Sequence, residues 1–116
     1  MREILFRGKT VCDGDWVYGG ITWNPSRKKF FIHTDWEEAK VIPETIGQYT
    51  GLTDKNGVTK VFEYDIIDAN GRKVGNYYEN SDLLKDGTCF LVARMGTKEW
   101  SRSEQEAIKR GCKYAE

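Results

Sequence analysis

The sequence lacks an excess of either charge. Its 116 residues include 18 lysines and arginines and 18 aspartates and glutamates, so the formal net charge is zero. Proteins dedicated to duplex nucleic acid normally carry a basic field, and this balance argues against that class while leaving room for a local basic patch. The length fits one ordinary domain, and a hydrophobic content of 39% is enough for a core. The sequence therefore predicts one folded domain spanning residues 1–116.

Long apolar runs are also missing. No stretch approaches the roughly 20 apolar residues that cross a bilayer. The opening residues, MREILFRG, lack the apolar segment of a secretory signal peptide. We therefore expect a cytoplasmic protein that makes no contact with membranes.

Cysteine is scarce, with only Cys12, Cys89 and Cys112. No two of them form a CxxC pair, so neither a zinc knuckle nor a thioredoxin-type site is indicated. Their neighbours are small or apolar, and we expect each thiol to behave as a small buried hydrophobic group. The sequence predicts no metal site and no cofactor.

His33 is the only histidine. A general base needs a group that orients it, and Asp35 could serve in that role. The same two residue types are common at polar strand ends, which is the interpretation we favour. Signatures of catalysis such as GxSxG, HExxH, a phosphate-binding loop or GxGxxG are absent, and the sequence predicts a protein that is not an enzyme.

Short aromatic and β-branched runs separated by turn residues fill the first half of the chain. The run around Gly19 and Gly20 predicts a hairpin, because glycine reaches the positive φ values of tight turns. The spacing is typical of a small barrel or sandwich of short antiparallel strands. The predicted strands cover residues 3–7, 16–18, 21–23, 28–33, 38–42, 46–52, 58–62 and 65–67.

The second half changes in character. Asn80 is a candidate N-cap for a short helix that Gly87 would end. Residues 88–94 predict a central strand, because both of its faces are apolar. Residues 101–114 predict a helix capped by Ser101 or Ser103, with a thin apolar stripe of Ile108, Cys112 and Ala115. The expected fold is mainly β with a C-terminal α-helix, or α+β by strict count.

Several motifs resemble the YopX family of bacteriophage and prophage proteins. They are MREILFRGK at residues 1–9, DWVYG at 15–19 and PETIGQYTGLTDKNG at 43–57, followed by FEYDII at 62–67 and VGNYYENSDLL at 74–84. The resemblance covers residues 1–84, with gaps at 10–13 and 20–42, and leaves 85–116 as a divergent strand and helix. It implies a phage or mobile-element origin, a bacterial host cell and a mainly β fold. It implies no activity, cofactor or catalytic residue.

Two departures from that pattern have structural consequences. Tyr64 stands where the family usually has glycine, so a positive φ at this position would be strained. Only residues 68–73 separate the FEYDII and VGN elements, whereas relatives place several strands there. Those strands of the usual fold cannot be present.

The aromatic content favours a noncatalytic binding or adaptor module. Tyr and Trp are common anchors at interfaces, since they bury a large rigid area and keep a polar tip. The expected partner is a protein, or a second copy of the chain, because short strands leave edges that need covering. The candidate contact residues are Trp16, Tyr18, Gln48, Tyr49 and Tyr78.

Two alternatives remain. In the first, a small β-barrel binds single-stranded nucleic acid, and aromatic side chains stack on its bases. The phosphates would be held by a basic patch of Arg27, Lys28 and Lys29 beside Phe30 and Phe31, or by Lys109, Arg110 and Lys113. In the second, a less favoured one, Glu63 and Asp65 share a strand face and hold Mg²⁺ for an enzyme.

Overall fold

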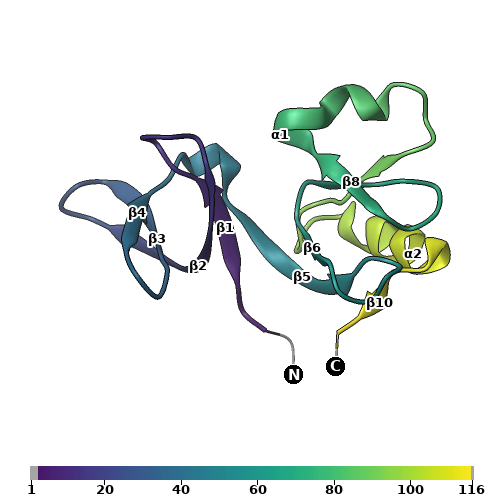
Figure 1. The fold of residues 1–116 in the computed structure, drawn as a ribbon, viewed down its shortest axis with the longest axis horizontal. Coiled ribbons are helices and arrows are strands. Elements are labelled where there is room, and N and C mark those ends of the chain that lie inside the picture. Colours follow the sequence, from purple (N-terminus) through teal and green to yellow (C-terminus); the bar gives the residue numbers. More distant parts are fainter. Residues whose placement is uncertain (1–2, 116) are drawn as a thin grey trace. The chain divides into compact units, whose positions relative to one another are not determined.

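The computed structural model describes residues 3–115. The contacts divide these residues into an N-terminal unit, residues 3–49, and a C-terminal unit, residues 50–115. Figure 1 shows both, coloured along the sequence. That the chain behaves as one cooperative domain stays a prediction.

The N-terminal unit is an antiparallel sheet. Its strands run in the order β1, β2, β3, β4, and β1 also pairs with the beginning of β5. Their bounds are β1 Phe6–Lys9, β2 Trp16–Asn24, β3 Lys29–His33, β4 Glu38–Lys40 and β5 Gly47–Thr53, with the 3-10 helix η1 at Pro43–Thr45. Ile32, Val41 and Tyr49 are among its buried side chains. An isolated bridge between Thr10 and Val41 links the chain after β1 to the chain after β4.

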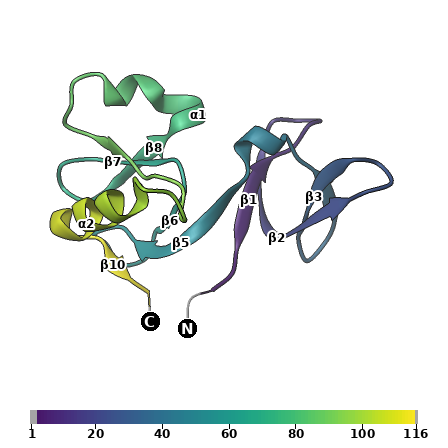
Figure 2. The same cartoon turned by 180° about the vertical axis from the view of Figure 1, so that it is seen from behind.

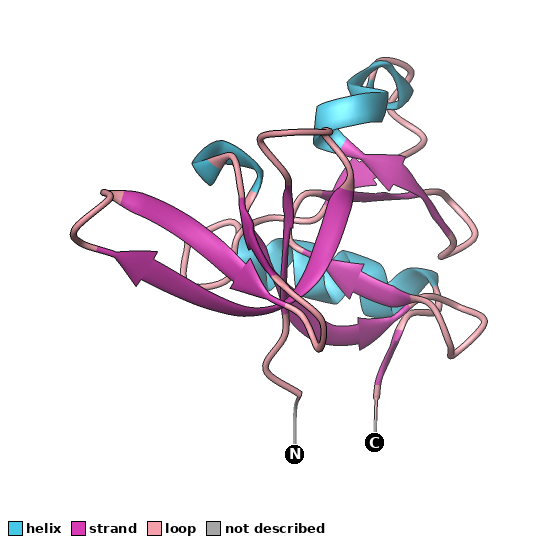
Figure 3. Cartoon of the chain, turned by 60° about the vertical axis from the view of Figure 1, so that its left-hand side comes forward, coloured by secondary structure: helices cyan, strands magenta, loops and turns pink. Residues whose placement is uncertain are grey.

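Figure 3 distinguishes the strands, in magenta, from the helices, in cyan. The expected hairpin at Gly19 and Gly20 is wrong, because both glycines lie inside the single strand β2. The first half of β2 pairs with β1 up to Gly19, and the second half pairs with β3 from Gly20 onward. A Cβ atom at Gly19 would lie 1.9 Å from the carbonyl oxygen of His33. The two glycines therefore mark the point where β2 changes its pairing partner from β1 to β3, and the missing side chain at Gly19 lets the backbone of β3 approach closely.

The C-terminal unit combines a three-stranded sheet with a helix (Figure 2). The sheet has the order β8, β7, β9, while β6 and β10 pair with the end of β5. The bounds are β6 Lys60–Phe62, β7 Asp65–Ile67, β8 Lys73–Asn76, α1 Tyr77–Asn80, η2 Ser81–Leu84, β9 Phe90–Leu91, α2 Trp100–Arg110 and β10 Lys113–Tyr114. The core cluster consists of Leu52, Val61, Ile67, Val92, Ala107 and Cys112.

The central strand expected at residues 88–94 is wrong in length and position. Only Phe90 and Leu91 form β9, which lies at the edge of its sheet next to β7. Val92 is buried in the core, whereas Phe90 and Leu91 stay half-buried. Apolar residues on both faces here reflect contact with the core and with helix α2 rather than a covered sheet position.

The C-terminal helix is confirmed at Trp100–Arg110, but its details differ from those predicted. Glu99 is the N-cap, without a side-chain capping bond, and the expected cap Ser103 is instead buried inside the helix. Its hydroxyl accepts a hydrogen bond from the Ala93 amide at 3.0 Å, so the serine joins the helix to the chain after β9. Ile108 is 47% exposed and does not form the predicted apolar stripe. Gly111 ends the helix with a φ of 119°.

The short helix predicted between Asn80 and Gly87 is a 3-10 helix, η2, which ends at Leu84. It is preceded by α1, whose side-chain cap is Asn76. The Asn76 side chain accepts hydrogen bonds from the amides of Tyr78 and Glu79 at the start of α1. Asn80 precedes η2 without capping it, and its side chain accepts a bond from the Asn76 amide at 3.1 Å. The two asparagines therefore fasten this turn to the end of β8.

Tyr64 has the positive φ that the resemblance indicated, with a value of 69°. The Tyr64 amide donates to the carbonyl of Val92 at 2.9 Å, and the Val92 amide donates to the carbonyl of Asp65 at 2.8 Å. Two residues thus face one across the ladder, which is the arrangement of a G1 β-bulge, whose first position normally holds glycine. Tyrosine at this position holds a left-handed backbone that costs an L-residue roughly 1–2 kcal/mol.

The predicted fold class is confirmed: short antiparallel strands dominate, and a C-terminal helix is present. Among the described residues the sheets do not close into a barrel. Neither α-helix has the length and apolar character needed to cross a bilayer.

Candidate functional site

The predicted contact residues of the N-terminal unit differ in their exposure. Tyr18 is 45% exposed, whereas Tyr49 is 2% exposed. Burial, and secondly the negative charge of Glu3, raises the pKa of Tyr49 above the usual tyrosine value. Trp16 is half-buried with the Arg7 guanidinium 4.5 Å from its ring centre, and Gln48 lies opposite Phe6 in the β1–β5 pair. Of these four side chains, Tyr18 presents the largest accessible surface.

Tyr78 belongs to the C-terminal unit and to a cluster of three tyrosines. Its ring centre lies 5.9 Å from that of Tyr64 and 5.8 Å from that of Tyr77, in edge-on arrangements. The Arg94 guanidinium lies 5.6 Å from the Tyr64 ring centre. The cluster packs over the bulge, so Tyr78 supports the strained Tyr64 backbone.

The basic patch lies in the turn between β2 and β3. Arg27, Lys28 and Lys29 are all exposed, and Phe30 is half-buried. Phe31, which the sequence placed beside the patch, is 5% exposed and belongs to the core. The second group of cations is divided, because Arg110 is held in an ion pair while Lys109 and Lys113 are exposed.

His33 lies at the end of β3, in agreement with the favoured interpretation of a polar strand end, and its ion-pair partner is Glu38 rather than Asp35. Its Nε2 lies 3.3 Å from a carboxylate oxygen of Glu38, the residue opposite it on β4. Both side chains are close to half exposed, and such ion pairs contribute about 0–1 kcal/mol. The pair is a surface contact between neighbouring strands.

Glu63 and Asp65 are both buried, and their carboxylates bond to the chain around them. Glu63 accepts a hydrogen bond from the Met95 amide at 2.8 Å. Asp65 accepts one from the Phe62 amide at 2.6 Å and forms an ion pair with Lys73 at 3.2 Å. These contacts give both carboxylates a role in holding the bulge. Residues 3–115 contain no group of three or more histidine, cysteine or acidic side chains placed to hold a metal ion.

The three cysteines differ in their environments. Cys112 is buried as predicted, and burial, followed by the charges of Asp54 and Asp68, raises its pKa to about 11. Cys89 is half-buried. Cys12 is exposed, against the expectation of burial, because it lies in the turn after β1 rather than in a strand. It borders a cavity of about 220 Å³ in the N-terminal unit, lined by Thr10, Cys12, Asp13, Glu37, Glu38, Ala39 and Lys40.

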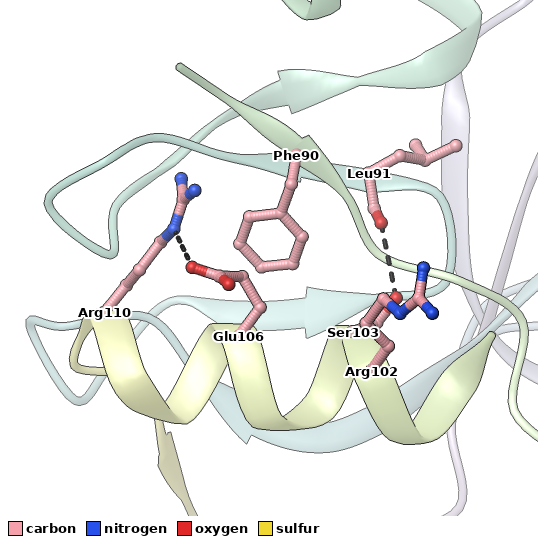
Figure 4. A pocket seen from close by; sticks show the side chains of 6 residues that line it. All are labelled: Phe90, Leu91, Arg102, Ser103, Glu106 and Arg110. Carbon is pink, nitrogen blue, oxygen red and sulfur yellow. Dashed lines mark hydrogen bonds and ion pairs between the residues drawn. The ribbon is translucent and has the colours of Figure 1, made fainter. Parts of the chain in front are cut away.

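A second cavity, of about 260 Å³, lies between β9 and α2 in the C-terminal unit (Figure 4). We call it the β9–α2 groove. Phe90 and Leu91 come from the strand, and four helix residues complete the lining, namely Arg102, Ser103, Glu106 and Arg110. Ser103 donates to the Leu91 carbonyl at 3.4 Å and so holds the helix against the strand. The groove therefore has an apolar strand wall and a polar helix wall.

The charges in the groove are arranged along the helix. The Arg110 Nε donates a hydrogen bond to the Glu106 carboxylate at 2.7 Å, and a terminal nitrogen of Arg110 donates to the Thr88 carbonyl at 2.8 Å. The Arg110 guanidinium also lies 4.8 Å from the Phe90 ring centre. The bond from Arg110 lowers the pKa of Glu106, which stays ionised at neutral pH and is not suited to act as a general acid. Arg102 is exposed and has no ion pair among residues 3–115. One end of the groove is neutralised, and the other carries a positive charge.

Sequence reasoning missed this groove. Phe90 and Arg110 lie in separate elements, and only the packing of α2 against β9 brings them together. The spacing of Glu106 and Arg110, four residues apart in a helix, was the one available signal, since it predicts an ion pair on one helix face.

Comparison with known proteins gives a family but no characterised relative. A family model described as YopX protein matches residues 17–74, which is half of the chain. No curated protein and no solved structure matches the sequence or the fold. The matched segment includes strand β2 from Val17 onward, the PETIGQYTGLTDKNG motif and the bulge at Tyr64. The chain belongs to the YopX family.

Proposed function

We propose that this protein is a noncatalytic binding module, an accessory protein of a phage or prophage, that holds one side chain of a protein partner in the β9–α2 groove. The carrying observation is the size and lining of that groove. At about 260 Å³ it is smaller than the roughly 300–1,000 Å³ typical of small-molecule sites. A cavity of this size suits a single anchoring side chain, which is how many protein interfaces gain their affinity.

The lining defines the chemistry of that anchor. Phe90 and Leu91 offer an apolar wall, so an aliphatic or aromatic side chain is favoured inside the groove. Arg102, at the end of the groove away from Arg110, can donate two hydrogen bonds to a carboxylate. The ionised Glu106 would repel a phosphate. The expected ligand is therefore a partner segment in which an apolar residue lies beside an aspartate or glutamate.

Selection of random twelve-residue peptides against the purified protein tests this proposal. We expect enrichment of peptides with an apolar residue next to an acidic one. Arg102→Glu should lower the affinity of the protein for the selected peptides roughly tenfold or more, because a hydrogen bond to a charged group contributes about 1.5–3 kcal/mol. Lys85→Glu is the matched control, since Lys85 is exposed, lies in the same unit and does not line the groove.

Two results would contradict the proposal. One is a selection without enrichment. The other is a set of peptides that binds the wild type and Arg102→Glu equally well. A second copy of the chain is one form that the partner can take, and sedimentation equilibrium with and without Arg102→Glu separates it from a foreign protein.

A further inference from the structure

The turn between β2 and β3 carries an exposed aromatic pair. Trp23 on β2 lies directly opposite Phe30 on β3, with ring centres 4.9 Å apart and planes inclined by 52°. Trp23 is 48% exposed, so much of its indole faces solvent. We call residues 23–30, which read WNPSRKKF, the hairpin tip. It lies wholly within the N-terminal unit and shares no residue with the β9–α2 groove.

The hairpin tip is also a local concentration of positive charge. Arg27, Lys28 and Lys29 are consecutive and exposed, and the segment contains no acidic residue. Within residues 3–115 none of the three cations forms an ion pair. The Arg27 guanidinium instead lies 5.7 Å from the Phe31 ring centre. In a chain of zero net charge, three adjacent cations without counter-charges form a surface that attracts anions.

The turn is held in one conformation. The Asn24 side-chain oxygen accepts a hydrogen bond from the Arg27 amide at 3.0 Å, and Asn24 pairs with Lys29 across the ladder. Lys28 has a φ of 55°, a left-handed conformation that is uncommon for a residue other than glycine. Because side chains alternate along a strand, Trp23 and Phe30 lie on one face of the hairpin, and Lys29 and Phe31, with the Arg27 guanidinium at its ring, lie on the other.

We propose that the hairpin tip binds single-stranded nucleic acid, with a base stacked on the exposed indole of Trp23 and the backbone crossing the end of the hairpin, where Arg27, Lys28 and Lys29 hold its phosphates. Stacking needs an aromatic face that solvent can reach, and binding of the backbone needs cations near it. An anionic membrane is the competing ligand for such a surface. It is disfavoured because a membrane anchor carries its apolar residues at the leading end, whereas here Pro25, Ser26, Arg27 and Lys28 form the end and Trp23 lies behind them.

Fluorescence anisotropy with labelled twelve-nucleotide oligothymidylate tests the proposal. Wild-type affinity should fall with a slope of about 2 in log K against log salt, since each phosphate contact on a single strand contributes roughly 0.7. Trp23→Ala should weaken binding about tenfold at low salt, within the range measured for loss of one base stack. Trp36→Ala is the matched control, because Trp36 is 93% exposed in the same unit and lies outside the hairpin tip.

A charge variant tests the phosphate contacts separately. Arg27→Ala, Lys28→Ala and Lys29→Ala combined should remove most of the salt dependence. The control combines Lys85→Ala, Lys98→Ala and Lys109→Ala, which change the net charge by the same amount at exposed positions of the other unit. This control should keep the salt dependence of the wild type. An oligonucleotide of abasic sites should bind wild type and Trp23→Ala alike, because it offers phosphates without bases. Thermal unfolding of each variant identifies any loss that comes from misfolding, and a misfolded Trp23→Ala is replaced by Trp23→Leu.

The proposal is overturned by any of three results. These are no binding to oligothymidylate at low salt, equal losses for Trp23→Ala and Trp36→Ala, and binding to vesicles of phosphatidylserine and phosphatidylcholine in place of the oligonucleotide. The peptide selection at the β9–α2 groove is unaffected by these outcomes, so the two proposals fail or succeed separately.

Discussion

Gly19 and Gly20 are adjacent in β2, yet alanine should be tolerated at only one of them. An added Cβ at Gly19 would lie 1.9 Å from the His33 carbonyl oxygen and 2.8 Å from its carbon. At Gly20 the same atom would meet no heavy atom within 4 Å. Neither glycine has a positive φ, so backbone strain is equal in the two variants and contact alone separates them.

The size of the difference follows from what each variant must move. The obstacle at Gly19 is backbone of strand β3, and relief requires a shift of that strand or loss of its hydrogen bonds. Overpacking of this kind costs about 1–3 kcal/mol, and a broken hydrogen bond adds about 1 kcal/mol. Gly20→Ala restricts only the unfolded chain and should stabilise by about 0.4–1 kcal/mol. The two variants should therefore differ by roughly 2–5 kcal/mol.

Urea unfolding followed by tryptophan fluorescence measures this difference. Trp16, Trp23 and Trp36 lie in the N-terminal unit, so the signal reports mainly on the unit that holds both glycines. We expect Gly19→Ala to unfold at lower urea and Gly20→Ala at equal or higher urea than wild type. Equal midpoints for the two variants would refute the close approach of β3. The same titration followed by far-ultraviolet circular dichroism tests the single-domain prediction, because coincident curves indicate one cooperative transition.

Two further predictions concern the C-terminal unit. Tyr64→Gly and Tyr64→Ala both lose the ring contacts with Tyr77 and Tyr78. Only glycine relieves the strain of the positive φ at this position. In urea unfolding, Tyr64→Gly should therefore be more stable than Tyr64→Ala by about 1 kcal/mol. Ala69→Gly, at an exposed position without a positive φ, should instead destabilise by about 0.4–1 kcal/mol, and an alanine preference at both sites would contradict the bulge. Because the pKa of the Cys112 thiol is raised, the folded chain keeps a proton that the unfolded chain releases at alkaline pH. The stability that this thiol contributes is complete below about pH 9 and is lost as the pH rises toward about 11. In Cys112→Ala the urea midpoint should fall less steeply between pH 9 and pH 11 than in the wild type. An equally steep fall in the variant would show that the Cys112 thiol is not the cause of this pH dependence.

Local sequence signals predicted most strands because those strands depend on neighbouring residues. The run KFFIH and the GQYTGLT segment are β-rich and bounded by turn residues, and both form strands at nearly the expected positions. The Asn56–Gly57 turn is likewise local, since the Asn56 side chain bonds the amides of Val58 and Thr59. Such features need no knowledge of the rest of the chain.

The errors arise where distant contacts decide the structure. Gly19 and Gly20 have the local signature of a turn, and only the pairing with β1 and then with β3 shows that they lie within a continuous strand. Residues 88–94 look like a central strand, yet Ser103 and the bulge at Tyr64 limit β9 to two residues. The same limit applies to the candidate sites. The basic patch could be predicted because its three cations are consecutive, whereas the groove required Phe90 and Arg110 from separate elements.

The pairing of β10 with β5 bears on how the chain folds during synthesis. The hydroxyl of Thr53 donates to the carbonyl of Lys113, sixty residues later, at 3.1 Å. In the N-terminal unit, in contrast, β1, β2, β3 and β4 pair in chain order, and β1 pairs with the beginning of β5, which is made well before the C-terminal strand. Because closing a long loop is slow, the nascent chain can build its first sheet on the ribosome while β5 waits for residues 113 and 114 to emerge. Until then the Leu52 and Thr53 backbone is open to chaperones or to a neighbouring nascent chain.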